Sequence, residues 1–251
     1  MAYLTGHDPD PKAFMANAVS LIEGGADILE IGIPFSDPVA DGPVIQAAGM
    51  RALAGGATPG SILDTIGELS SQFTIPFVLL TYYNPILAMG IERFLRNASE
   101  KGVNGIVVPD LPMEEADRFR DMALKHSIDN IYLAAPNTSA ERLGNIVEKS
   151  RGFVYLISLY GVTGPRDTLS PQALETVKRV KSVAKGKVPV SAGFGISQPE
   201  QVSSLLRAGA DGAIVGSALV RTVAEHLDDP ENAPYYLMKT MMALKQASRQ
   251  C

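Results

Sequence analysis

A short glycine-containing motif recurs three times in this chain, and it constrains the fold more than any other feature. Each copy reads glycine, then alanine or valine, then aspartate or asparagine, within residues 23–27, 100–104 and 207–211. Glycine readily adopts the left-handed conformation that ends many helices, and an apolar run follows each copy within a few residues. Three such helix ends joined to strands predict one repeated architecture rather than two unrelated domains.

Short apolar runs alternate with amphipathic stretches along the chain. Most of the runs are continuously hydrophobic, which is typical of parallel strands buried on both faces. Eight of them are expected to be strands, at residues 2–5, 27–33, 77–82, 105–108, 130–134, 153–158, 188–191 and 212–215. Strands that alternate with helices form βαβ units. We therefore predict an α/β fold, a (β/α)8 TIM barrel that is a single domain over residues 1–251.

The charge balance and the single cysteine exclude several classes of protein. The net charge is −5, from 22 basic and 27 acidic side chains, so no broad nucleic-acid surface is expected. Cys251 is the only cysteine, and an intrachain disulfide therefore cannot form. No apolar stretch approaches the roughly 20 residues that span a bilayer, and no targeting signal is visible. We expect a cytoplasmic protein with no nucleic-acid or membrane partner.

The segment between the second and third expected strands is much longer than the others. Its first part, residues 34–43, is rich in turn formers, and an extra helix is expected at residues 44–53 before the regular helix that begins at Pro59. In barrels the loops that follow the strands build the active site. The site is therefore expected first around this loop.

Glu30 lies in the middle of the second expected strand. Strand alternation places it on one face with Ile28 and Gly32, and Leu29 and Ile31 on the other. A buried carboxylate without a partner is unfavourable and its pKa tends to rise. Such a residue is either half of a structural ion pair or a tuned acid-base group, and the spacing alone leaves both open.

Asp41 follows in the long loop, directly before the turn-forming pair Gly42-Pro43. That turn allows the side chain to lie over the barrel mouth, so that Glu30 and Asp41 would flank a substrate. In the alternative reading, Asp37 and Asp41 make Asx turns or cap the helix expected from Val44.

Glycine motifs follow the seventh and eighth expected strands, at Gly193-Phe194-Gly195 and at Gly216-Ser217. Glycine lets backbone N–H groups approach an anion closely, and a helix that begins at Ser217 adds the positive end of its dipole. Many barrels bind phosphate at these two loops. We predict a phosphate site here; the alternative is that the glycines only turn the chain.

A third glycine-rich loop, residues 158–166, follows the sixth expected strand. It is interpreted as a mobile lid, and the alternative is an ordinary surface loop.

Tyr82, Tyr155 and Phe194 lie at or just beyond strand ends, where they would contact an aromatic ring or simply pack in the core. No spacing of His, Cys or carboxylate residues resembles a metal site.

Five segments of the chain resemble the tryptophan synthase alpha subunit family, in order and over nearly the whole length: residues 29–46, 107–112, 161–164, 193–197 and 216–217. The resemblance implies a (β/α)8 barrel that cleaves indole-3-glycerol phosphate into indole and glyceraldehyde 3-phosphate, a lyase reaction of tryptophan biosynthesis. It also implies that this subunit uses no cofactor and pairs with a beta subunit in an α2β2 complex.

The resemblance also implies roles for individual residues. Glu30 matches the catalytic glutamate that protonates the indole ring and manages the glycerol hydroxyl proton, and Asp41 matches the aspartate that pairs with the indole N–H. Thr163 matches a lid threonine that bonds this aspartate. The remaining matches are phosphate contacts at Gly164, Gly195, Gly216 and Ser217 and pocket-lining positions at Tyr82, Tyr155 and Phe194.

Two departures from the family pattern are visible. The family begins with a helix that covers the barrel floor, whereas here Met1 runs almost directly into the first strand, so an exposed apolar patch is expected at the floor. Leu159-Tyr160 stand where many bacterial members have Arg-Ser, which removes a charge from the lid. Two rival functions remain: a free-standing lyase that releases indole, and a regulatory subunit with little activity, against which the retained Glu30 and Asp41 count.

Overall fold

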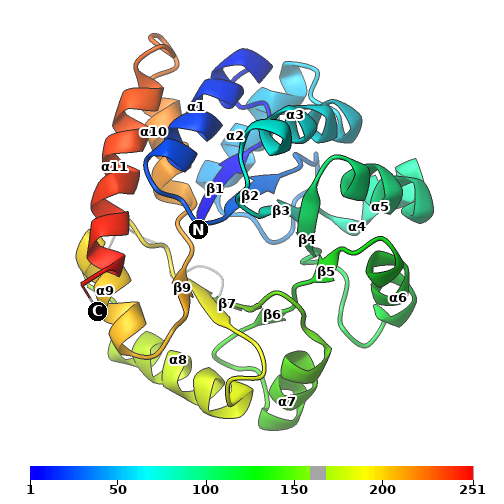
Figure 1. Cartoon of the computed structure of the whole chain (residues 1–251), viewed down its shortest axis with the longest axis vertical. Coiled ribbons are helices and arrows are strands. Elements are labelled where there is room, and N and C mark those ends of the chain that lie inside the picture. The colour runs from blue at the N-terminus through cyan, green and yellow to red at the C-terminus, as the bar shows by residue number, and fades with distance from the viewer. Residues whose placement is uncertain (159–167, 251) are drawn as a thin grey trace.

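The computed structural model describes residues 1–158 and 168–250, and in this part parallel strands form a ring that helices surround (Figure 1). All eight expected strands are present, and the fifth is divided in two. The strands are β1 (Ala2–Thr5), β2 (Leu29–Gly32), β3 (Phe77–Leu80), β4 (Val103–Val107), β5 (Asp129–Asn130), β6 (Leu133–Ala134), β7 (Val154–Ile157), β8 (Val190–Gly193) and β9 (Gly212–Ala213).

The strands pair in the order β1-β2-β3-β4-β5 and β6-β7-β8-β9, and all pairs are parallel. A bridge between Ala2 and Val215 joins the two ends of this order. On the opposite side, the backbone between β5 and β6 continues the ladder, because the N–H of Ile131 donates to the carbonyl oxygen of Ile106. The ring is therefore closed, as in TIM barrels.

Several helices begin or end at capping residues. Asp10 accepts a hydrogen bond from the backbone of the first turn of α1, and Ser170 does the same for α8. The glycines of the three repeated motifs have positive φ, 101° at Gly25, 83° at Gly102 and 103° at Gly209, which confirms the expected left-handed helix ends. The helices are α1 (Pro11–Glu23), α2 (Pro43–Ala54), α3 (Pro59–Gln72), α4 (Tyr83–Met89), α5 (Ile91–Glu100), α6 (Asp117–Lys125), α7 (Ala140–Lys149), α8 (Pro171–Ala184), α9 (Pro199–Arg207), α10 (Ser217–Glu225) and α11 (Ala233–Ser248).

The extra helix expected after the second strand is α2, and the regular helix from Pro59 is α3. Helix α9 has Gln198, and not the preceding Ser197, as its N-cap. The side-chain oxygen of Gln201 accepts from the N–H groups of both Ser197 and Gln198, so the longer amide side chain satisfies these donors.

Among the described residues, none of the helices is long and apolar enough to cross a membrane.

Strand alternation separates an outer core from an inner one. Leu29 and Ile31 of β2 are fully buried against the surrounding helices. Between them, Glu30 is in register with Tyr3 on β1 and with Val78 on β3. Val78 belongs to a separate apolar cluster inside the barrel, so Glu30 shares the barrel interior with it.

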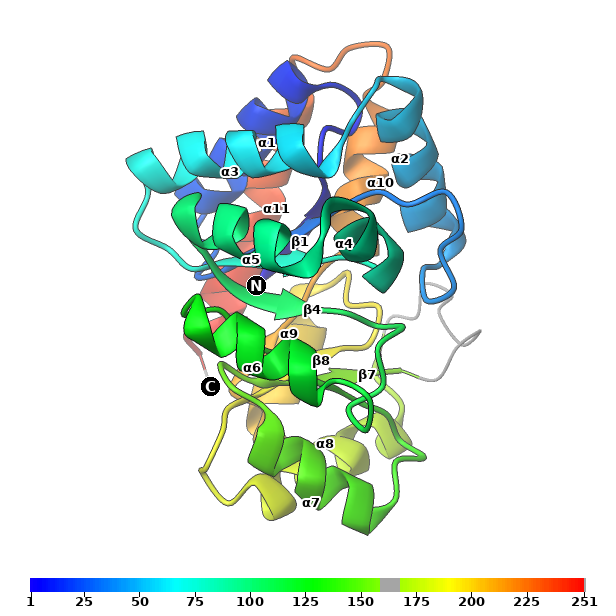
Figure 2. The same cartoon turned by 90° about the vertical axis from the view of Figure 1, so that its right-hand side faces the viewer.

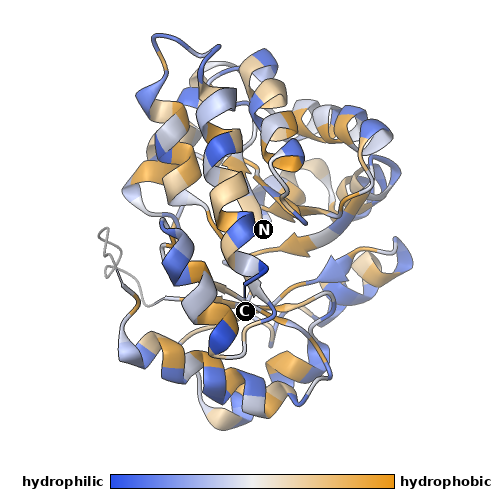
Figure 3. Cartoon of the chain, turned by 60° about the vertical axis from the view of Figure 1, so that its left-hand side comes forward, coloured by the Kyte–Doolittle hydropathy of each residue, from blue (hydrophilic) through white to orange (hydrophobic). Residues whose placement is uncertain are grey.

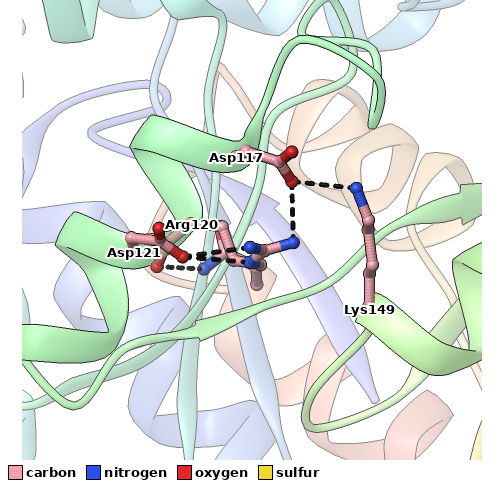
Figure 4. A network of polar contacts seen from close by, with 5 residues as sticks. Asp117, Arg120, Asp121 and Lys149 are labelled. Atoms are coloured by element: carbon pink, nitrogen blue, oxygen red, sulfur yellow. Dashed lines mark hydrogen bonds and ion pairs between the residues drawn. The ribbon is translucent and has the colours of Figure 1, made fainter.

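The outer surface is polar and is held partly by ion pairs. Along the outer helices, hydrophilic and hydrophobic residues alternate, whereas the strands in the middle are mostly hydrophobic (Figure 3). Arg120 bridges Asp117 and Asp121 on α6, and Lys149 at the end of α7 also donates to Asp117 (Figure 4). These exposed contacts join neighbouring helices and lie on the outside of the barrel, where each adds little to stability.

The two ends of the barrel differ. The loop between β2 and α2 lies at one edge of the molecule, and the N-terminus lies toward the other side (Figure 2). At the amino ends of the strands, a cavity of about 420 Å³ is bounded by residues that directly precede strands, such as Ile28 and Phe153, and by Met241 and Leu244 of α11. The amino group of Met1 donates to the carbonyl oxygen of Ala213 beside it (2.9 Å).

Candidate active site

A second cavity, of about 430 Å³, opens at the carboxyl ends of the strands. It is bounded by the loop after β2 and by the loops after β7, β8 and β9, which meet there because all the strands are parallel. Its lining combines apolar strand residues with a few polar groups, a composition common in sites for small molecules. We call it the mouth pocket, and its lining includes Tyr3, Asp41, Leu80, Leu133, Tyr155, Gly195, Ile214, Gly216, Ser217 and Arg221.

Glu30 lies inside the barrel, beneath the mouth pocket. Its side chain is fully buried, and neither carboxyl oxygen has a hydrogen-bond partner among the described residues. Tyr3, its register neighbour, and Tyr155 line the pocket directly. Glu30 itself does not line the open cavity, and its side chain is not exposed to solvent in this structure.

Burial sets the acidity of Glu30. Loss of solvation raises its pKa from the ordinary 4.5 to about 8. The positive N-terminal amino group and the Tyr155 hydroxyl partly offset this rise, while the charge of Asp41 adds to it. Tyr155 is near enough to exert this effect, although the pair does not meet hydrogen-bond geometry. A carboxyl group with this pKa is mostly protonated at neutral pH and can donate a proton.

Asp41 lies at the rim, in the loop between β2 and α2. Burial raises its pKa, and a contact with the Tyr82 hydroxyl lowers it in part. The same hydroxyl accepts from the N–H of Ala40 (3.0 Å), which fixes the loop over β3. The N-cap of α2 is Gly42, and no side chain caps it. Helix capping, the alternative role considered for Asp41, is therefore not what this side chain does here.

The opposite rim carries the glycine motifs. Gly195 is exposed and has a φ of 70°, a conformation that other residues adopt only with strain. Helix α10 begins at Ser217 with Gly216 as its N-cap, and the first helical hydrogen bond is donated by the N–H of Val220. The N–H groups of Ser217, Ala218 and Leu219, which precede it, have no acceptor within the helix. They lie at the N-terminus of α10, which is the positive end of the helix dipole.

The structure brings together some of the predicted residues and not others. Asp41, Tyr155, Gly195, Gly216 and Ser217 line the mouth pocket. Three other predicted residues do not line it: Glu30 lies below it, Tyr82 is buried behind the loop, and Phe194 packs against the outer core. Two more, Thr163 and Gly164, lie outside the described residues, as do Leu159 and Tyr160.

Tyr3 and Arg221 line the pocket but were not predicted as site residues. Tyr3 is buried at the base, and the hydroxyl groups of Tyr3 and Thr5 are 3.4 Å apart. Its place could have been found from the alternation of β1, which puts it opposite Glu30. Arg221 follows Ser217 by four residues, about one helical turn, so the sequence spacing could have indicated that it lies on the same face of the helix. Among residues 1–158 and 168–250, no cluster of three or more His, Cys, Asp or Glu side chains could hold a metal ion.

Comparisons with known proteins identify the family of this chain. The family model for the tryptophan synthase alpha chain matches residues 1–249. The tryptophan synthase alpha chain of Methanoregula boonei is 46% identical over 250 residues, which cover 100% of this chain and 94% of that protein. The one from Pyrococcus abyssi is 45% identical and covers 91% of each chain.

A solved structure described as the tryptophan synthase α2β2 complex of Pyrococcus furiosus superposes with a TM-score of 0.91 and 42% identity. The match covers 98% of this chain and 96% of that one. The chain therefore belongs to the tryptophan synthase alpha chain family, lyases of tryptophan biosynthesis that cleave indole-3-glycerol phosphate.

Proposed function

We propose that this chain cleaves indole-3-glycerol phosphate at the mouth pocket, with Glu30 and Asp41 as its acid-base pair. The observation that carries the proposal is the buried carboxyl group of Glu30, whose pKa is raised to about 8 beneath a pocket with a glycine-rich opposite rim. A neutral carboxyl group and an anion-binding rim are what cleavage of a phosphorylated indole substrate needs.

Glu30 first donates its proton to C3 of the indole ring, which gives an electron-poor indolenine. The carboxylate left behind then accepts the proton of the glycerol hydroxyl next to the ring. The carbon-carbon bond breaks, its electron pair returns to the ring to give indole, and the hydroxyl carbon becomes the aldehyde of glyceraldehyde 3-phosphate. One group serves as acid and then as base, so the protons balance over the cycle.

Asp41 accepts the indole N–H and stabilises the positive charge that develops on the ring nitrogen. A fixed carboxylate aimed at a developing charge lowers the barrier because it needs no rearrangement during the reaction. At the other rim, the backbone of Gly195, Gly216 and Ser217 binds the phosphate. Tyr155 borders the ring in this arrangement, and Tyr82 supports it by holding the loop of Asp41.

We further propose that residues 1–251 act as one domain and pair with a beta subunit. Solved relatives from Pyrococcus furiosus are described as a tryptophan synthase complex and as an α2β2 complex with mutual activation. In this chain, Val39 is an apolar residue 73% exposed in the loop that also carries Asp41. A partner that covers Val39 would contact the catalytic loop directly, which suits coupling between subunits.

We also infer that the barrel floor is left partly uncovered by the described residues. Support comes from the floor cavity of about 420 Å³, whose lining includes Ile28, Phe153 and Met241. A dye that fluoresces on apolar surfaces should bind there, and Ile28→Ser, which removes apolar lining, should weaken its binding. Unchanged dye binding in that variant would refute the inference.

The test of the main proposal is to incubate the purified chain with indole-3-glycerol phosphate and to measure indole, with and without a beta subunit. Weak activity that the beta subunit raises supports the lyase of a complex. High activity of the chain alone supports the free-standing lyase instead. No indole under either condition would overturn the proposal and favour the regulatory subunit.

A further inference from the structure

Arg221 is the one positively charged residue among the described residues that line the mouth pocket. It is half-buried on α10, and within residues 1–158 and 168–250 its side chain takes part in none of the ion pairs or hydrogen bonds. Other cations near helix ends do have such partners, as Arg51 has in Asp8 and Lys181 in Asp211. A half-buried guanidinium without a partner is poised to bind an anion.

The helix directs Arg221 toward the glycine-rich rim. Arg221 follows Ser217 by four residues, so the two lie on the same face of α10. Side chains on a helix lean toward its N-terminus, which places a long guanidinium side chain over the preceding turn. That turn begins at Gly216 and Ser217, which also line the pocket.

The charges of the pocket favour a cation beside the phosphate. A phosphate monoester carries about −1.5 to −2 charges at neutral pH, whereas a helix N-terminus supplies only about half a positive charge. Asp41 is the acidic side chain among the described lining residues, and its charge opposes the binding of an anion. Backbone N–H groups alone therefore leave a negative excess that a guanidinium can offset.

We propose that Arg221 is a substrate-binding residue whose guanidinium binds the phosphate monoester at the α10 rim. This inference rests on the proposed function of the pocket and adds a charged side chain to a rim otherwise made of backbone. Because phosphate keeps its charge throughout the cleavage, the contact is equal in substrate and transition state, so it affects affinity and not turnover.

The test compares Arg221→Gln, Arg221→Lys and a control, Lys239→Gln, which removes an exposed charge on α11. Calorimetry measures the Kd of glycerol 3-phosphate, and indole release gives KM and kcat. We expect Arg221→Gln to raise both Kd and KM about tenfold with kcat within about twofold, in line with a half-buried charged hydrogen bond. Arg221→Lys should recover most of the affinity, and Lys239→Gln should match the wild type.

A pH series separates a charge contact from a structural role. The wild type should bind glycerol 3-phosphate more tightly at pH 7.5 than at pH 5.5, because the ester gains its second charge near pH 6. Arg221→Gln should lose most of this gain, and Lys239→Gln should retain it.

Equal affinity in Arg221→Gln and the wild type would overturn the role of Arg221 while leaving the function of the pocket intact. If the wild type itself neither binds the ester nor releases indole, the proposed function fails with it.

Discussion

Replacing Glu30 with glutamine should abolish activity and yet stabilise the fold at alkaline pH. Glutamine has almost the same shape as a protonated glutamate but donates no proton to carbon. Loss of an acid-base group lowers rates by about 10² to 10⁴, and since Glu30 is proposed to serve twice in one cycle we expect the upper end of this range. Indole release should fall accordingly while glycerol 3-phosphate still binds.

The stability effect follows from the pKa of Glu30. Its value is 4.5 in an unfolded chain and about 8 in the folded protein, so between these pH values the folded state holds a proton that the unfolded state has lost. Stability from this group is therefore complete below about pH 4.5 and falls as the pH rises toward 8. The whole shift corresponds to roughly 5 kcal/mol, an upper bound for the gain of Glu30→Gln at pH 8 to 9.

The assay is urea unfolding of the wild type and Glu30→Gln at pH 5, 7 and 9. The free energy of unfolding of the variant should exceed that of the wild type by a margin that grows with pH. Glu68→Gln, which changes an exposed glutamate on α3, is the control and should show no such trend. Parallel pH curves for Glu30→Gln and the wild type would refute the raised pKa, and near-normal indole release would refute the catalytic role.

Three further outcomes follow from the same geometry. Asp41→Asn should lower kcat about 10²- to 10³-fold in indole release; a change confined to KM would contradict its role at the ring nitrogen. Tyr155→Phe should raise the pKa of Glu30 further, because the hydroxyl now lowers it, and should move the alkaline limb of the kcat/KM profile to higher pH; an unmoved limb would argue against this contact. Gly195→Ala should lose about 1 to 2 kcal/mol in urea unfolding, since φ is 70° there, and should raise KM; unchanged stability would show that the loop relaxes freely.

The chain sequence alone predicted the strands, the three glycine-marked helix ends and the extra helix after the second strand. Continuous apolar runs and glycine-containing helix ends are local signals, and they identify a buried parallel strand or a left-handed cap wherever they occur. At the start of α9 the side chain of Gln201 accepts from the backbone N–H groups of Ser197 and Gln198, a contact that no glycine or proline motif predicts.

The tertiary structure decided which side chains share a cavity, and it set the pKa of Glu30. Glu30 was expected to flank a substrate together with Asp41, but only the closed ring buries its side chain completely and thereby raises its pKa. Arg221 lines the pocket because α10 begins at the glycine rim, whereas Phe194 packs against the outer core. Strand identity depends on neighbours in the chain, but desolvation and pocket lining depend on residues far apart in sequence, and the barrel alone brings them together.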